Sequence, residues 1–87
     1  MSVIMCKRMY GRLSARAVHR VETSEGVIAE VVVVEPNGDE YVVKCLCRVE
    51  GTTVDGEGDA LCYLNERYGD VAFCTAVRNA AMGNATP

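Results

Sequence analysis

The stretch VVVVEPNGDEYVVKCLC (residues 31–47) decides the fold, because two runs rich in β-branched residues flank a sequence typical of a tight turn. Pro36 favours the backbone angle of the first central position of a type I turn, and Gly38 can adopt the left-handed conformation that a bulged three-residue loop requires. We therefore predict a β-hairpin whose loop pairs Glu35 with Asp39.

This loop predicts how the two strands pair. On one face the pairs are Val33–Tyr41, Val31–Val43, Ala29–Cys45 and Val27–Cys47, and on the other they are Val32–Val42, Glu30–Lys44 and Ile28–Leu46. The alternative is a two-residue loop of Asn37 and Gly38, which would place Glu30 opposite Cys45 and move side chains to the wrong face. The first register gives one wholly apolar face and a cross-strand ion pair, so it is favoured.

The segment before the hairpin, residues 12–22, alternates in polarity. Leu13, Ala15, Ala17, His19 and Val21 fall on one side, and Arg12, Ser14, Arg16, Val18 and Arg20 fall on the other. The arginines are also spaced four apart, so a helix is the alternative. Alternation over this length, followed by the short polar connection 22–26, favours a strand. We expect a three-stranded antiparallel meander of residues 12–22, 27–34 and 40–49.

The pattern changes after residue 50. Ala60, Leu61, Leu64 and Tyr68 form one helical stripe, with Asp59 or Asp55 as the N-cap and Gly69 as the end, which predicts a short helix at 59–68. Residues 71–78 favour a fourth strand, although the alanines from Ala76 onward favour a helix. The expected class is α+β, in the order β-β-β-α-β, with the helix on one face of the sheet.

Composition indicates one small domain spanning residues 1–87, because the chain has 87 residues and an apolar share of 49 %. Residues 1–11 are expected to form a flexible basic arm, and residues 79–87 a frayed tail. No secretory leader and no apolar run long enough to span a membrane is visible, which predicts a cytoplasmic protein. The odd number of cysteines, 5, predicts free thiols that are largely buried.

Charge is distributed unevenly along the chain. The net charge is −3, yet residues 1–21 contain bases and no acid. In the favoured register, cations gather with aliphatic side chains on the sheet face that the helix leaves open. The predicted partner-binding residues on this face are Arg12, Arg16, Arg20, Lys44, Arg48, Val32 and Leu46. An alternative acidic surface comprises Asp55, Glu57, Asp59 and Glu66.

Other chemistry has weaker support in the sequence. The pair Cys45 and Cys47 lacks the usual zinc spacing, and the acidic series 55–66 has Ala60 where a calcium loop has glycine. His19 is the only histidine, and no acid lies near it in the sequence to orient it for catalysis. No cofactor, metal or catalytic residue is predicted.

These observations favour a small protein-interaction module without catalysis. The profile of a small acidic domain is common among inhibitors encoded by phages and mobile elements, such as anti-CRISPR proteins, which cover a working surface of a host complex. An inhibitor of this kind is the specific expectation, with a protein partner and a possible homodimer. The alternative is a homodimeric nucleic-acid-binding or regulatory module that uses the arginine-rich face.

Overall fold

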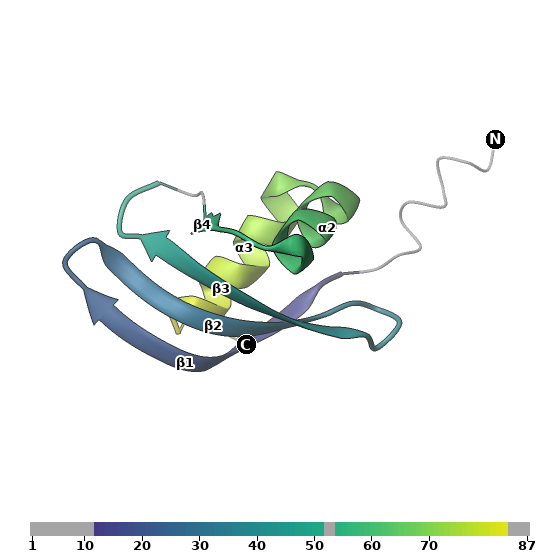
Figure 1. The fold of residues 1–87 in the computed structure, drawn as a ribbon, viewed down its shortest axis with the longest axis horizontal. Coiled ribbons are helices and arrows are strands. Elements are labelled where there is room, and N and C mark those ends of the chain that lie inside the picture. The colour runs from purple at the N-terminus through teal and green to yellow at the C-terminus, as the bar shows by residue number, and fades with distance from the viewer. Residues whose placement is uncertain (1–11, 52–53, 84–87) are drawn as a thin grey trace.

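The computed structural model describes residues 12–51 and 54–83, which form a four-stranded antiparallel sheet with two helices on one face (Figure 1). The α+β class and the meander are therefore confirmed. The strands are β1 (Ser14–Thr23), β2 (Gly26–Val34), β3 (Glu40–Arg48) and β4 (Val54–Gly56), in the spatial order β1-β2-β3-β4. The helices are α2 (Asp59–Tyr68) and α3 (Asp70–Ala81).

The hairpin of β2 and β3 has the predicted register at every pair, from Val33–Tyr41 to Val27–Cys47. The backbone N–H of Glu35 donates to the carbonyl of Asp39 at 2.9 Å, and the N–H of Gly38 donates to the carbonyl of Glu35 at 2.8 Å. Gly38 has a φ of 98°, so the three-residue loop uses its glycine as the sequence predicts.

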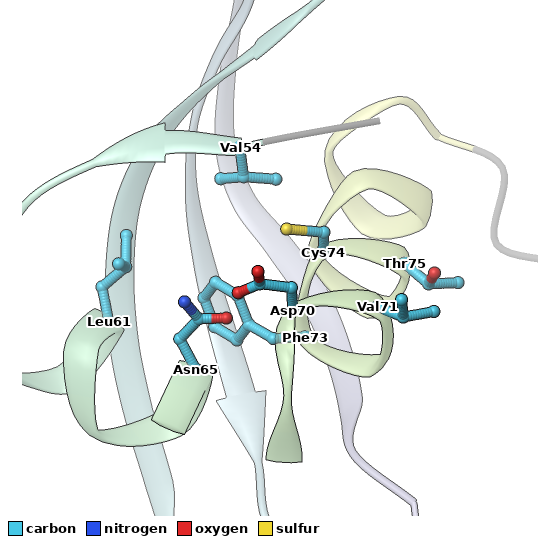
Figure 2. A pocket seen from close by; sticks show the side chains of 8 residues that line it. All are labelled: Val54, Leu61, Asn65, Asp70, Val71, Phe73, Cys74 and Thr75. Atoms are coloured by element: carbon cyan, nitrogen blue, oxygen red, sulfur yellow. The ribbon is translucent and has the colours of Figure 1, made fainter. Parts of the chain in front are cut away.

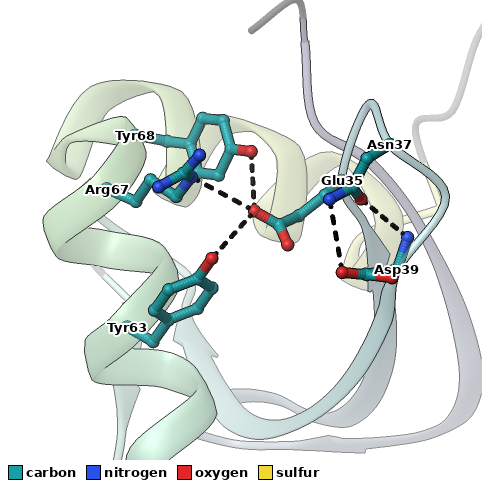
Figure 3. A network of polar contacts seen from close by, with 6 residues as sticks. All are labelled: Glu35, Asn37, Asp39, Tyr63, Arg67 and Tyr68. Carbon is teal, nitrogen blue, oxygen red and sulfur yellow. Dashed lines mark hydrogen bonds and ion pairs between the residues drawn. The ribbon is translucent and has the colours of Figure 1, made fainter.

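Glu35 also joins the hairpin to α2 through its side chain (Figure 3). Its carboxylate is 3 % exposed and accepts hydrogen bonds from the hydroxyls of Tyr68 at 2.7 Å and Tyr63 at 3.3 Å. The guanidinium Nε of Arg67 lies 3.4 Å from the same oxygen, Oε2. A buried carboxylate is stable only with such partners, so this contact fixes α2 over the loop end of the hairpin.

The core lies between the sheet and the two helices. Its buried residues are Val27, Ala29, Val31 and Val33 of β2, Val43, Cys45 and Cys47 of β3, Leu64 of α2, and Phe73, Val77, Ala80 and Ala81 of α3. The strand residues are all odd-numbered, which agrees with the predicted apolar face. Hydrophobic burial on this single face therefore holds both helices to the sheet.

The prediction of a fourth strand at residues 71–78 is wrong, because these residues lie in α3. The buried residues Phe73, Val77, Ala80 and Ala81 have the spacing of one helical face, i, i+4, i+7 and i+8. The fourth strand is instead Val54–Gly56, which precedes α2 and pairs with β3. The prediction of a frayed tail from residue 79 is wrong for residues 79–81, which lie in α3, and residues 84–87 lie outside the described residues.

The predicted helix at 59–68 is confirmed, and so is Gly69 as its end. Gly69 has a φ of 91°, and its N–H donates to the carbonyl of Asn65 at 2.8 Å. The predicted N-cap at Asp59 or Asp55 is wrong, because Gly58 holds that position and no side chain caps the helix. The predicted basic arm at residues 1–11 lies outside the described residues.

We predict that Gly38→Val destabilises the protein by about 1–2 kcal/mol, because a β-branched residue resists positive φ. A Cβ at this position would meet no atom within 4 Å, so the effect comes from the backbone alone. The control is Gly38→Asn, which should be milder because asparagine tolerates positive φ better. Urea denaturation measures both variants. Equal stability of the valine variant and the parent would contradict the assigned loop.

We also predict a loss of stability at alkaline pH. Burial, followed by the hydrogen bond and charge of Glu35, raises the pKa of Tyr41 from 10.0 to about 12, and burial raises the pKa of Tyr68. A raised pKa stabilises the fold fully below pH 10, and this contribution is lost as the pH rises to about 12. Urea midpoints measured across this range should fall less steeply for Tyr41→Phe than for the parent. Identical slopes would contradict the coupling of Tyr41 to Glu35.

Candidate functional site

A β-bulge in β1 determines which side chains share the open face of the sheet. Ala17 pairs with Val31, but the next paired residue is His19, opposite Glu30, so Val18 is left between them. One extra residue reverses the alternation that follows it. Before the bulge the even-numbered residues of β1 point to the open face, and after it the odd-numbered residues do.

The bulge corrects two sequence-based assignments. Arg20 pairs with Ala29 on the helix-covered face, so the prediction that it shares the open face with Arg16 is wrong. Its Nε donates to the carbonyl of Ala81, in the last turn of α3. His19, predicted on the apolar face, instead lies exposed on the open face. Arg20 is therefore a helix-capping residue, since cations stabilise the carbonyl end of a helix.

Two of the cations that remain on the open face form ion pairs within the sheet. Lys44 Nζ lies 3.8 Å from a carboxylate oxygen of Glu30, and Arg48 Nε donates to Asp55 at 2.7 Å. Arg16 has no ion-pair partner among the described residues, and Arg12 is exposed just before β1. The face is therefore less basic than the sequence suggests.

Aliphatic side chains make up much of the same face. Val42 is 58 % exposed, Ile28 is 50 % exposed and Val21 is 47 % exposed. The two aliphatic residues predicted to bind the partner are less exposed than these three, since Val32 is only 7 % exposed and Leu46 is half-buried. No helix or loop among residues 12–51 and 54–83 covers this face (Figure 1). An uncovered face of this composition is typical of a binding surface.

A shallow groove of about 320 Å³ crosses this face beside the bulge. Its lining residues are His19, Val21, Ile28, Ala29, Glu30 and Lys44. The sequence pattern assigned His19 and Val21 to the covered face. They lie on the open face only because Val18 has no partner in β2. Strict alternation carries no signal for a bulge, so these two residues could not be placed on the open face from the sequence.

The predicted acidic surface is not brought together as a cluster. Asp55 pairs with Arg48 at the sheet edge, Glu57 follows β4, and Asp59 and Glu66 lie exposed on α2. Within the described part of the chain, no group of three or more histidine, cysteine or acidic side chains could hold a metal ion. These acids therefore act as separate surface charges.

The thiols are free, as predicted, at the four described positions Cys45, Cys47, Cys62 and Cys74. Cys45 and Cys47 are buried side by side on β3, and the hydrogen bond between the thiols together with burial raises the pKa of Cys45. The expectation of burial is wrong for Cys62, which is exposed on α2. The buried pair therefore belongs to the core.

A second cavity, of about 400 Å³, lies on the helix side of the sheet between β4, α2 and α3 (Figure 2). Its lining residues are Val54, Leu61, Asn65, Asp70, Val71, Phe73, Cys74 and Thr75. Burial raises the pKa of the Cys74 thiol, against a hydrogen bond from the backbone of Val54 that lowers it. The sequence did not indicate this cavity, because its polar residues meet only when the two helices pack.

Comparison with known proteins adds no assignment to either surface. No protein-family model, curated protein or solved structure matches this chain. Among the described residues, no helix has the length and apolar composition needed to cross a membrane. The functional argument therefore depends on the geometry of the two surfaces.

We predict that Arg20→Ala lowers the free energy of unfolding by about 1 kcal/mol, because it removes a charged hydrogen bond to the end of α3. The matched control is Arg16→Ala on the same strand, which should change stability by less than about 0.5 kcal/mol, as for most surface substitutions. Chemical denaturation measures both. Equal effects of the two substitutions would contradict the placement of Arg20 on the helix-covered face of the sheet.

Proposed function

We propose that this protein is a non-enzymatic interaction module whose open sheet face binds a partner protein. The observation that carries the proposal is the contrast between the two faces of one sheet. Two helices cover one face, whereas the other exposes Val21, Ile28 and Val42 to solvent. Exposing several aliphatic groups on one face is unfavourable in water, and a protein partner relieves this by burying them.

The charges on this face support a protein partner over nucleic acid. Lys44 and Arg48 are already paired with acids, so their charges are largely balanced before any partner binds. Binding to a phosphate backbone requires cations that are free to replace counterions. On the open face, the Glu30–Lys44 ion pair lies between the aliphatic pairs Ile28–Leu46 and Val32–Val42. Apolar contacts combined with charges that are already balanced are typical of protein interfaces.

Arg16 is the residue on this face that is best placed to bind a charged group of the partner. It lies opposite the nearly buried Val32 and has no ion-pair partner among the described residues. A guanidinium can bind a carboxylate through two parallel hydrogen bonds, and neighbouring aliphatic groups exclude water from them. The partner surface is therefore proposed to carry an acid opposite Arg16 and apolar side chains opposite Val42 and Ile28.

The finer proposal is that binding inhibits a host protein or protein–nucleic-acid complex, as anti-CRISPR proteins do. Its support is the profile of a small acidic domain with one uncovered face. A blocking protein acts by occupying a surface, so inhibition should reach completion near one copy per target. Full inhibition by far less protein than target would indicate catalysis and contradict this proposal.

We predict that Arg16→Glu combined with Val42→Glu weakens partner binding roughly 30-fold or more, because the pair removes a charged contact and an apolar one, together worth about 2 kcal/mol. The control is Cys62→Glu, at a residue that is exposed on α2 and lies outside the cavity lining, which should bind as the parent does. The measurement is quantitative affinity capture from host lysate with each variant, followed by titration of the purified partner.

Three further readouts discriminate between the outcomes. Binding that survives nuclease treatment and falls only mildly with salt supports a protein interface, whereas a steep loss with salt supports the nucleic-acid module. Self-association of the parent alone, abolished by the double variant in sedimentation, would identify a second copy as the protein partner. A partner that the double variant binds as tightly as the parent does would show that this face is not the site.

A further inference from the structure

The cavity between β4, α2 and α3 combines an apolar wall with two polar side chains that accept hydrogen bonds. Leu61, Phe73 and Val54 supply apolar side chains from three different elements. Asn65 and Asp70 project into the same space from α2 and from the first turn of α3 (Figure 2). A volume of about 400 Å³ lies within the range of small-molecule sites, which are mostly apolar with a few placed polar groups.

The amide of Asn65 gives the first indication of what would bind. Its Oδ1 is buried and has no hydrogen-bond partner among the described residues. A buried acceptor without a donor destabilises a fold by roughly 1–3 kcal/mol. The torsion that orients a terminal amide has a broad energy profile, so a small rotation turns this oxygen into the cavity. A ligand that carries a donor would therefore recover a hydrogen bond that the free protein lacks.

Asp70 indicates the charge of that ligand. Its carboxylate also lines the cavity, and none of the ion pairs among the described residues involves it. A carboxylate offers acceptors only, so Asp70 and Asn65 together suit a group that donates several hydrogen bonds and is positive. An ammonium has three donors and one positive charge, and an aliphatic stem would contact Leu61 and Phe73.

We infer that the cavity between β4, α2 and α3 is a binding site for a primary alkylammonium, which Asp70 and Asn65 hold at its head and Leu61 and Phe73 contact along its stem. Such a group occurs in free amines and at the end of a lysine side chain. The site lies on the helix side of the sheet and shares no residue with the open face. The inference is therefore independent of the proposed partner interface.

Cys74 provides a direct measure of occupancy, because its thiol lines the cavity. The test uses the full chain with Cys6→Ser and Cys62→Ser, which leaves Cys74 more accessible than the buried Cys45 and Cys47. Alkylation is followed at about pH 8, below the usual amine pKa of about 10.4, so the probe stays charged. Amide shifts in an NMR titration give a second measurement of binding.

The probes are n-hexylamine, n-hexanol and hexanoate, which share a stem and differ in the charge of the head. We expect hexylamine to slow alkylation of Cys74 and to shift amides of α2 and α3. Hexanol should bind roughly 10-fold more weakly, as loss of a charged hydrogen bond implies, and hexanoate should not bind measurably. Equal binding of all three probes, or no protection by hexylamine, would overturn the inference without any variant being needed.

Variants then assign the head group. Asp70→Asn should weaken hexylamine binding roughly 10-fold and leave hexanol binding unchanged, whereas Asn65→Asp should strengthen hexylamine binding. The matched control is Asp59→Asn, which removes an exposed acid from the first turn of α2, outside the cavity lining. Equal loss with Asp59→Asn and Asp70→Asn would show a general charge effect and contradict the site.

A final comparison distinguishes the two sources of the ammonium. Nα-acetyl-lysine methylamide carries the same head group on a peptide backbone. If it protects Cys74 as well as hexylamine does, the site accepts a lysine side chain of a protein. If only hexylamine protects, the site takes a free amine.

Discussion

The pairing of Glu35 with Asp39 across the hairpin loop is the constraint on which the rest of the structure depends. It sets the register of β2 against β3, and the register decides which residues of both strands face the helices. A slip of one residue would turn one strand over relative to the other, which would move either Val31 or Val43 into solvent and charged side chains into the core. The carboxylate of Glu35 also contacts Tyr63, Arg67 and Tyr68 and so fixes the position of α2. This one glutamate therefore links the geometry of the loop to the placement of the helix.

The bulge at Val18 determines which residues of the edge strand β1 face each side of the sheet. It lets β1 supply Arg16 to the open face and Arg20 to the covered face, although alternation from the sequence puts both on one side. Arg20 thereby reaches the end of α3, and His19 and Val21 join the open face in exchange. An edge bulge also discourages pairing with another sheet, because it interrupts the ladder of backbone donors and acceptors. The face of β1, rather than its edge, is thus the surface that we propose a partner binds.

The two proposed surfaces lie on opposite sides of the sheet and have different chemistry. The open face is broad and largely aliphatic, and Lys44 and Arg48 form ion pairs with acids on the same face. Such a surface is suited to binding another protein. The cavity between β4, α2 and α3 is small and has unpaired acceptors, which suits a compact cation. Both could be occupied at once, since the core separates them.

The sequence by itself determined the features that depend on neighbouring residues. The turn at Pro36 and Gly38, the register, the helix at 59–68 with its end at Gly69, and the aliphatic character of the open face all follow from local pattern. Only the tertiary structure decided the rest. Residues 71–78 form a helix because their apolar face can cover β1 and β2, while three residues at Val54–Gly56 take the sheet edge. Contacts between residues far apart in the chain likewise produce the bulge, the capping role of Arg20 and the cavity. Such contacts cannot be predicted from local periodicity.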